Sequence, residues 1–270
     1  MKPIFPVIYI AGVARSGTSW VGQVLNSCSR VVYRFQPFFA YEFKGRLHED
    51  SPPEDFRHVF SEMRQADTPF LTQADKVASG LYPAFEKVVA PDILVFKENR
   101  YQSLVPQALR KVPELGLLAI VRNPCAVLNS WRKNPKEFPS GSDFSWEWRH
   151  GMCKNTGPQD CFGYYRWKEA ANQYLDLEAQ FPERVRVLRY EDAVANPAEV
   201  FQEVFSFFGL PYESQSRSFL ADSTSTHSDS YYAVYKDASV ADKWREELEP
   251  EIAAEIQADL SGTRLARFLS

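Results

Sequence analysis

The sequence predicts an α/β fold in which a mainly parallel central sheet is flanked by helices on both faces. Short apolar runs such as Asp92–Lys97 (DILVFK) and Leu115–Val121 (LGLLAIV) have the composition of buried strands. Segments with helical spacing of apolar residues alternate with these runs, which is typical of parallel sheets. A turn containing Gly17 joins the first apolar run to the first helix. We therefore expect a phosphate-binding loop at the carboxyl end of the first strand.

The remaining elements follow from apolar spacing, prolines and glycines. The expected strands are Ile4–Ile10, Val31–Phe39 with its exit turn at Pro37, Asp92–Lys97, Leu115–Val121 and Val185–Arg189. The expected helices are Thr18–Leu25, Glu54–Gln65, a segment near Pro83–Val89, Ser103–Lys111, Cys125–Lys133, Tyr164–Phe181, Pro197–Phe208 and closing helices within Glu251–Phe268. Residues 134–163 are rich in aromatic and turn-forming residues, which predicts an irregular lid with one short helix.

Length and charge limit the class of protein. The chain has 270 residues and is expected to form a single domain over residues 1–270, because no Gly/Ser- or Pro-rich linker interrupts it. Its formal net charge of −4 argues against nucleic acid or an anionic membrane as a partner, so any anion site must be local. No window reaches the roughly 18 consecutive apolar residues of a membrane span. The four cysteines form neither a disulfide framework nor a zinc pattern, so a cytoplasmic location is the default expectation.

The stretch Ile8–Leu25 (IYIAGVARSGTSWVGQVL) is predicted to form a strand, a tight turn and a helix. The N–H groups of such a turn and of the first helical turn converge on one point, where the helix dipole also favours negative charge. Gly12 and Gly17 have the spacing of the GxxxxGK[ST] pattern of nucleotide triphosphatases, but Thr18 occupies the lysine position. Without that lysine, the loop is poorly suited to a nucleoside triphosphate with magnesium.

The turn offers hydroxyl groups and one cation instead. The hydroxyls belong to Ser16, Thr18 and Ser19, and the cation is Arg15. These groups suit one anionic group and require no metal ion. A small-molecule kinase is a second hypothesis because it shares the loop architecture. Its signals would be a lysine in the loop, which is missing here, and a downstream aspartate that binds magnesium.

The string RSGTSW resembles the 5′-phosphosulfate loop of sulfotransferases that use 3′-phosphoadenosine 5′-phosphosulfate (PAPS) as donor and release adenosine 3′,5′-bisphosphate (PAP). The string VRNPCAVLNSW resembles the 3′-phosphate motif of that family, and the string beginning VLRYED resembles its adenine segment. The resemblance implies that Trp20 stacks on the adenine and that a cation of a C-terminal basic loop stands at Lys236. The donor-binding residues that it implies are Arg15, Ser16, Gly17, Thr18, Ser19, Trp20, Arg122, Ser130, Tyr190 and Lys236.

The spacing of Arg122 and Ser130 supports the choice of donor. Eight residues separate them, about two helical turns, so a guanidinium and a hydroxyl can converge on one phosphate. A nucleotide with a 3′-phosphate needs such a pair, whereas ATP does not. The second motif therefore favours PAPS over ATP.

The resemblance also implies catalytic roles. Lys97 matches the lysine of the KTH segment in cytosolic members, which supports the sulfuryl group, and Arg15 neutralises charge at the same end of the donor. Two positions that carry the base in relatives hold neutral carboxamides here, Gln36 and Asn99, which do not accept a proton at neutral pH. Glu98 is the candidate base, with Glu42 and an acceptor that needs little deprotonation as alternatives.

The resulting hypothesis is a PAPS-dependent sulfotransferase. It moves the sulfuryl group by in-line displacement to a hydroxyl, or as a second choice an amine, of a glycan, a lipid or a small metabolite. Residues 41–89 are expected to frame the acceptor pocket. The loop is more similar to those of carbohydrate-type and bacterial members than to those of cytosolic phenol sulfotransferases. A catalytically inactive, nucleotide-binding member of the same fold is the main alternative, and the oligomeric state stays open.

Overall fold

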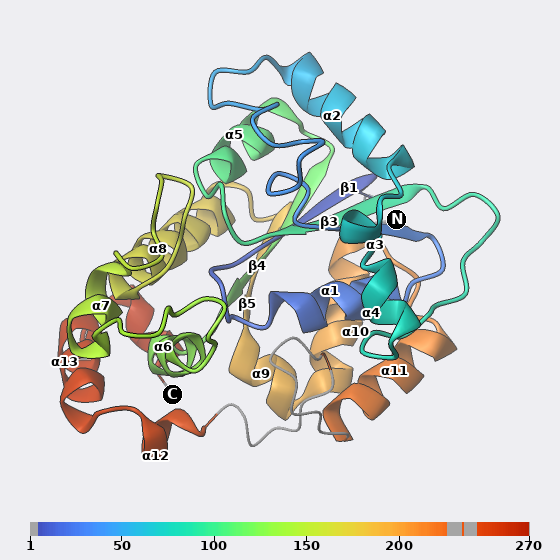
Figure 1. Cartoon of the computed structure of the whole chain (residues 1–270). Helices are drawn as coiled ribbons and strands as arrows, with labels where there is room; N and C mark the ends of the chain where they lie inside the picture. The colour runs from blue at the N-terminus through green and yellow to red at the C-terminus, as the bar shows by residue number, and fades with distance from the viewer. Residues whose placement is uncertain (1–4, 226–233, 235–241, 270) are drawn as a thin grey trace.

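The computed structural model describes residues 5–225, 234 and 242–269. In these residues, five parallel strands form one sheet in the order β2-β3-β1-β4-β5, which confirms the predicted α/β fold (Figure 1). The strands are β1 (Val7–Ala11), β2 (Val31–Phe35), β3 (Ile93–Glu98), β4 (Leu115–Val121) and β5 (Val185–Arg189).

Helices cover both faces of the sheet, and Figure 1 shows α2, α5 and α8 on one side and α1, α10 and α11 on the other. The α-helices in the first half of the chain are α1 (Thr18–Asn26), α2 (Pro53–Gln65), α3 (Pro69–Thr72), α4 (Ala74–Ala78), α5 (Leu104–Lys111) and α6 (Pro124–Arg132). Those in the second half are α7 (Phe144–His150), α8 (Tyr164–Gln180), α9 (Tyr190–Ala195), α10 (Pro197–Phe208), α11 (Ser214–Ser225), α12 (Trp244–Glu247) and α13 (Pro250–Leu260), followed by a 3₁₀ helix at Arg264–Phe268.

The central strands are apolar because they are covered on both sides. All residues of β1, β3 and β4 are buried, so these strands carry continuous rather than alternating hydrophobic residues. Two apolar cores result: Phe96 belongs to the core beneath α2 and α5, and Val95 belongs to the core beneath α1 and α10. Because successive side chains of a strand point to opposite faces, Lys97 and Glu98 leave β3 in opposite directions.

The structure corrects two predictions made from the sequence. The first strand begins at Val7 rather than Ile4, and no helix forms near Pro83–Val89. That segment is extended because partners elsewhere satisfy its backbone: Glu86 exchanges hydrogen bonds with the Gln215 side chain, and the Val88 N–H donates to the Ser29 carbonyl. The short helices α3, α4 and α9 and the 12-residue helix α11 were not expected, whereas α7 confirms the single short helix of residues 134–163.

None of the helices in the described part of the chain has both the length and the apolar character needed to cross a membrane.

We expect Phe96→Ala to lower the free energy of unfolding by about 3–5 kcal/mol, because it empties a site between packed rings. Phe96 is fully buried, and its ring centroid lies 4.4 Å from that of Tyr9 and 5.4 Å from that of Phe60. Denaturant unfolding measures the change. Tyr41→Ala is the control, since Tyr41 is 97% exposed and its loss should change stability by less than about 0.5 kcal/mol. Equal effects of the two variants would contradict this account of the core.

Candidate active site

The turn after β1 has a backbone that only a few residue types adopt readily. Arg15 and Gly17 have positive φ angles of 71° and 83°. A Cβ atom at Gly17 would lie 2.3 Å from the ring of Tyr190, and one at Gly12 would lie 2.6 Å from Thr18 Cγ2. Both glycines are therefore required by close packing, and Gly17 by its conformation as well. The turn, which follows the first strand, therefore packs closely against Tyr190 at the start of α9.

The groups that this turn presents fit an anion. No side chain caps the N-terminus of α1, so its first N–H groups are available to a ligand. The Ser16 hydroxyl is fully buried and has no hydrogen-bond partner among the described residues. An unpaired buried hydroxyl is costly unless a ligand completes it. Ser16 itself does not line the adjoining cavity, whereas Gly17, Thr18 and Ser19 do, so the predicted fit to an anionic group depends on these three residues.

A cavity of about 820 Å³ opens beside the turn, where the parallel strands end. Its described wall contains seven cationic side chains and two acidic ones, although the whole chain carries a net charge of −4. The cations are Arg15, Lys76, Lys97, Arg100, Arg122, Lys136 and Lys154, and the acids are Asp75 and Glu137. The predicted local anion site therefore coincides with a concentrated positive charge.

Arg15 links the two predicted phosphate motifs. Its Nε donates to Ser130 Oγ at 3.1 Å, and its carbonyl oxygen accepts from Arg122 Nη1 at 3.1 Å. The Arg122 guanidinium lies 4.8 Å from the ring centroid of Tyr190, and its carbonyl accepts from the indole of Trp167 at 2.9 Å. Ser130 lies on helix α6, which begins at Pro124 and has its N-terminus capped by the Asn123 side chain. The fold thus brings both motifs to one cavity.

Lys97 is the most buried cation of the cavity, with 2% of its surface exposed. Burial lowers its pKa to about 7, against the charge of Glu98, which raises it. Its Nζ lies 4.4 Å from the ring centroid of Phe35. Lys76 lies against the same ring and donates to the Tyr82 hydroxyl at 3.2 Å, and burial lowers the Lys76 pKa to about 8. An incoming anion would favour the charged form of both lysines.

Glu98 does not line the cavity. It is fully buried on the opposite side of β3, and its Oε1 accepts from the backbone N–H groups of Asn99 and Arg100 at 3.0 and 3.2 Å. Burial raises the Glu98 pKa. This geometry makes Glu98 a residue that shapes the turn after β3. Glu42, the alternative base, is exposed and also lies outside the wall.

Gln36 and Asn99 do line the cavity, as neutral carboxamides. Gln36 has a positive φ of 44°, and its N–H donates to the Lys97 carbonyl at 2.7 Å. Asn99 Oδ1 accepts from the Thr18 hydroxyl at 2.9 Å. These bonds tie the ends of β2 and β3 to each other and to the anion-binding turn.

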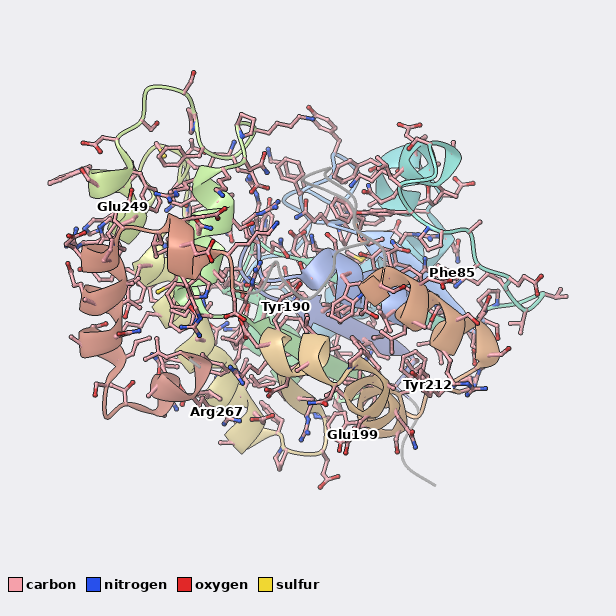
Figure 2. All side chains as sticks on the ribbon, turned by 90° about the horizontal axis from the view of Figure 1, so that it is seen from below. Phe85, Tyr190, Glu199, Tyr212, Glu249 and Arg267 are labelled. Atoms are coloured by element: carbon pink, nitrogen blue, oxygen red, sulfur yellow. The ribbon has the colours of Figure 1, made fainter. Side chains whose placement is uncertain are left out.

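The residues predicted at the adenine lie together. The rings of Trp20 and Tyr190 meet edge to face at 5.9 Å, and the indole N–H of Trp20 donates to Ser223 at 2.9 Å. Figure 2 shows Tyr190 near the middle of the molecule, at the start of α9. Ser19 also lines the cavity. Lys236 lies outside the described residues.

Sequence reasoning missed several cations and both acids of the wall. Asp75 and Lys76 lie on the short helix α4, and Lys136, Glu137 and Lys154 lie in the segment between α6 and α8. Neither segment has a motif of its own. For these residues, the sequence offered only the general expectation that the two segments surround the acceptor. In the described part of the chain, no three His, Cys, Asp or Glu side chains come together as a metal site.

A family model of the sulfotransferase family matches residues 6–214, which is more than half of the chain. The chain therefore belongs to the sulfotransferase family, as the motifs predicted. A comparison with curated proteins found no significant match.

Solved structures share the fold at low sequence identity. A mouse sulfotransferase complexed with PAP is 13% identical, with a TM-score of 0.58 and coverage of 100% of this chain and 90% of that one. A sulfotransferase domain of the curacin biosynthetic pathway is 18% identical, with a TM-score of 0.53 and coverage of 97% and 98%. A retinol dehydratase in complex with androsterone and the inactive cofactor PAP is 15% identical, with a TM-score of 0.57 and coverage of 98% and 83%.

We expect Gly17→Ala to weaken the binding of PAP by about tenfold or more, because the added methyl group displaces the turn from Tyr190 and misaligns at least one N–H group. Gly45→Ala is a matched control: Gly45 has a similar φ of +72°, but nothing lies within 4 Å of its added Cβ. Both variants should lose about 1–2 kcal/mol of stability from the positive φ. Calorimetric titration measures the affinity, and unchanged binding in Gly17→Ala would contradict the role of the turn.

Proposed function

We propose that the protein transfers the sulfuryl group of PAPS to a hydroxyl group of an acceptor. The single observation that carries this proposal is that Arg15 of the first predicted phosphate motif contacts both Ser130 and Arg122 of the second. Two anion sites in one cavity suit a nucleotide with phosphate at its 3′ and 5′ positions. Membership of the sulfotransferase family supports the same donor.

Each part of the donor has complementary groups. Gly17, Thr18 and Ser19 at the N-terminus of α1 would hold the 5′-phosphate, with Ser16 proposed from the sequence motif, and Arg122 with Ser130 would hold the 3′-phosphate. Trp20 and Tyr190 would hold the adenine, while Lys236 is proposed as a further cation from sequence alone.

The chemistry needs charge stabilisation at the sulfuryl end of the donor. The acceptor oxygen forms a bond to sulfur as the bond between sulfur and the 5′-phosphate oxygen breaks, and the electron pair of that bond leaves with PAP. Arg15 and Lys97 would neutralise the charge that develops on the phosphate and sulfuryl oxygens. The buried position of Lys97 strengthens this interaction because little water screens it.

The acceptor side of the cavity is partly apolar. Phe35, Phe39 and Phe70 contact one another and line the wall, and Phe39 and Phe70 are 43% and 39% exposed. These rings support the proposal of an acceptor with an apolar face or a ring, within the predicted range of glycan, lipid and small metabolite.

The four cysteines are free, which supports the proposed cytoplasmic location.

Calorimetric titration with PAP, and with ADP plus magnesium in parallel, tests the donor class. We expect PAP to bind more tightly. We further expect Arg122→Ala to weaken PAP by about 10- to 100-fold, the effect of losing a charge-assisted contact, and to weaken 5′-AMP much less. Arg57→Ala is the control, because Arg57 pairs with Glu114 away from the cavity. A preference for ADP with magnesium would favour the kinase hypothesis, and equal weakening of both ligands would refute the role of Arg122.

We expect the affinity for PAPS to fall as the pH rises above about 7. Protonated Lys97 attracts the donor, and the lowered pKa means that this charge is lost from the free protein near neutrality. Binding must then take up a proton, which costs up to about tenfold in affinity per pH unit. The measurement is PAPS affinity against pH for the wild type and for Lys97→Met, in which this dependence should be reduced.

Lys87→Met is the matched control for that series. Burial also lowers the pKa of Lys87, to about 8, but Lys87 lies outside the cavity and donates to the Cys28 carbonyl at 3.1 Å. Its replacement should leave the pH profile of binding unchanged. An identical profile in wild type and Lys97→Met would show that Lys97 does not act on the donor.

A further inference from the structure

The candidate active site has few groups that can accept a proton. Gln36 and Asn99 are carboxamides, and Glu98 lies outside the wall with one oxygen engaged by two backbone N–H groups. No histidine belongs to the wall as far as the structure describes it, and the carboxylates there are Asp75 and Glu137.

Lys97 and Lys76 have lowered pKa values, but an anionic donor favours their charged forms, which cannot accept a proton. In the described part of the wall, the two carboxylates are then the remaining candidates for a general base.

Glu137 lies at the end of the cavity where the sulfuryl group is proposed to react. Its Oε2 is 3.8 Å from Nη1 of Arg15, and its charge also acts on Lys97. The same oxygen is buried and accepts no hydrogen bond from the described residues. It therefore has capacity for one donor, which an acceptor hydroxyl would supply.

The backbone holds Glu137 in place. Its N–H donates to the Asn134 carbonyl at 2.9 Å, and its carbonyl accepts from the indole of Trp131 at 2.9 Å. Trp131 is 1% exposed and packs against Phe138 and Phe162. A base has to be positioned within a fraction of an ångström. These hydrogen bonds and ring contacts make the backbone at Glu137 rigid.

Asp75 lacks these properties. It lies in the first turn of the five-residue helix α4 and is exposed. Water can solvate its carboxylate, and no residue of the wall pairs with it in the way that Arg15 pairs with Glu137 in the described structure. Of the two carboxylates, Glu137 fits the role of base.

We propose that Glu137 is the general base of this enzyme, an inference that rests on the proposed function. The acceptor O–H transfers its proton to Oε2 of Glu137 while the acceptor oxygen bonds to sulfur. The bond from sulfur to the 5′-phosphate oxygen breaks, and its electron pair leaves with PAP. Arg15 and Lys97 face the charge on the leaving group, and the protonated Glu137 afterwards returns its proton to solvent.

The test compares Glu137→Gln with the wild type and with Glu203→Gln as the matched control, because Glu203 also lies beside an arginine, at 3.4 Å from Arg186, but outside the cavity wall. Consumption of PAPS is measured with water, aliphatic alcohols and phenols as acceptors, and PAP affinity is measured by calorimetry. We expect Glu137→Gln to be about 100-fold slower or more with water and alcohols, the size of a general-base contribution. PAP affinity should stay the same or increase, because a negative charge beside Arg15 has been removed. Glu203→Gln should behave like the wild type in both measurements.

A purely structural role gives a different result. If Glu137 only positions Arg15, then Glu137→Gln weakens PAP binding and slows all acceptors equally. If it is the base, the defect shrinks for acidic phenols, which lose their proton readily without help.

Three outcomes would overturn the inference or its basis. Turnover of Glu137→Gln at the wild-type rate would refute the base, and so would a wild-type protein that binds PAP but consumes PAPS with none of these acceptors. A wild-type protein that fails to bind PAP would instead refute the proposed function, which keeps the two failures distinguishable.

Discussion

The close approach between the Gly17 backbone and the Tyr190 ring is the constraint on which the site depends. It fixes the turn after β1 against the start of α9, so that a segment near residue 17 and one near residue 190 share one wall. Arg122 lies against the same ring and reaches the Arg15 carbonyl. A side chain at position 17 would separate these segments, and the two anion-binding motifs would no longer face one cavity.

Parallel strands explain how an acidic protein builds a cationic cavity. The carboxyl ends of β1, β3 and β4 meet at one edge of the sheet. The turns that follow them contribute Arg15, Arg100 and Arg122, and the end of β3 itself contributes Lys97. Burial of Lys97 removes its charge from water, and this desolvation lowers the pKa of Lys97. An anionic donor would favour the charged form of Lys97, so binding would offset part of that cost.

Local patterns predicted the elements that rest on local chemistry. The apolar runs, the proline-started helices and the turn at Gly17 were identified because their spacing and residue types act over a few positions. The segment 83–88 was mispredicted as helical because its backbone is satisfied by residues as distant as Gln215. Glu98 was a plausible base by position, but the alternation of side chains along β3 turns it away from the cavity beside Lys97.

The sequence by itself determined the fold class and the family and located the two predicted phosphate motifs, because each depends on short strings whose residue types can be interpreted without knowledge of their partners in space. Only the tertiary structure decided which charges share the cavity. Lys76, Lys136 and Glu137 come from segments without a motif. Long-range contacts place them, such as those of Lys76 with the Phe35 ring and of Glu137 with Arg15. A carboxylate becomes a candidate base through its neighbours in space, and neighbours in space are what a linear pattern does not contain.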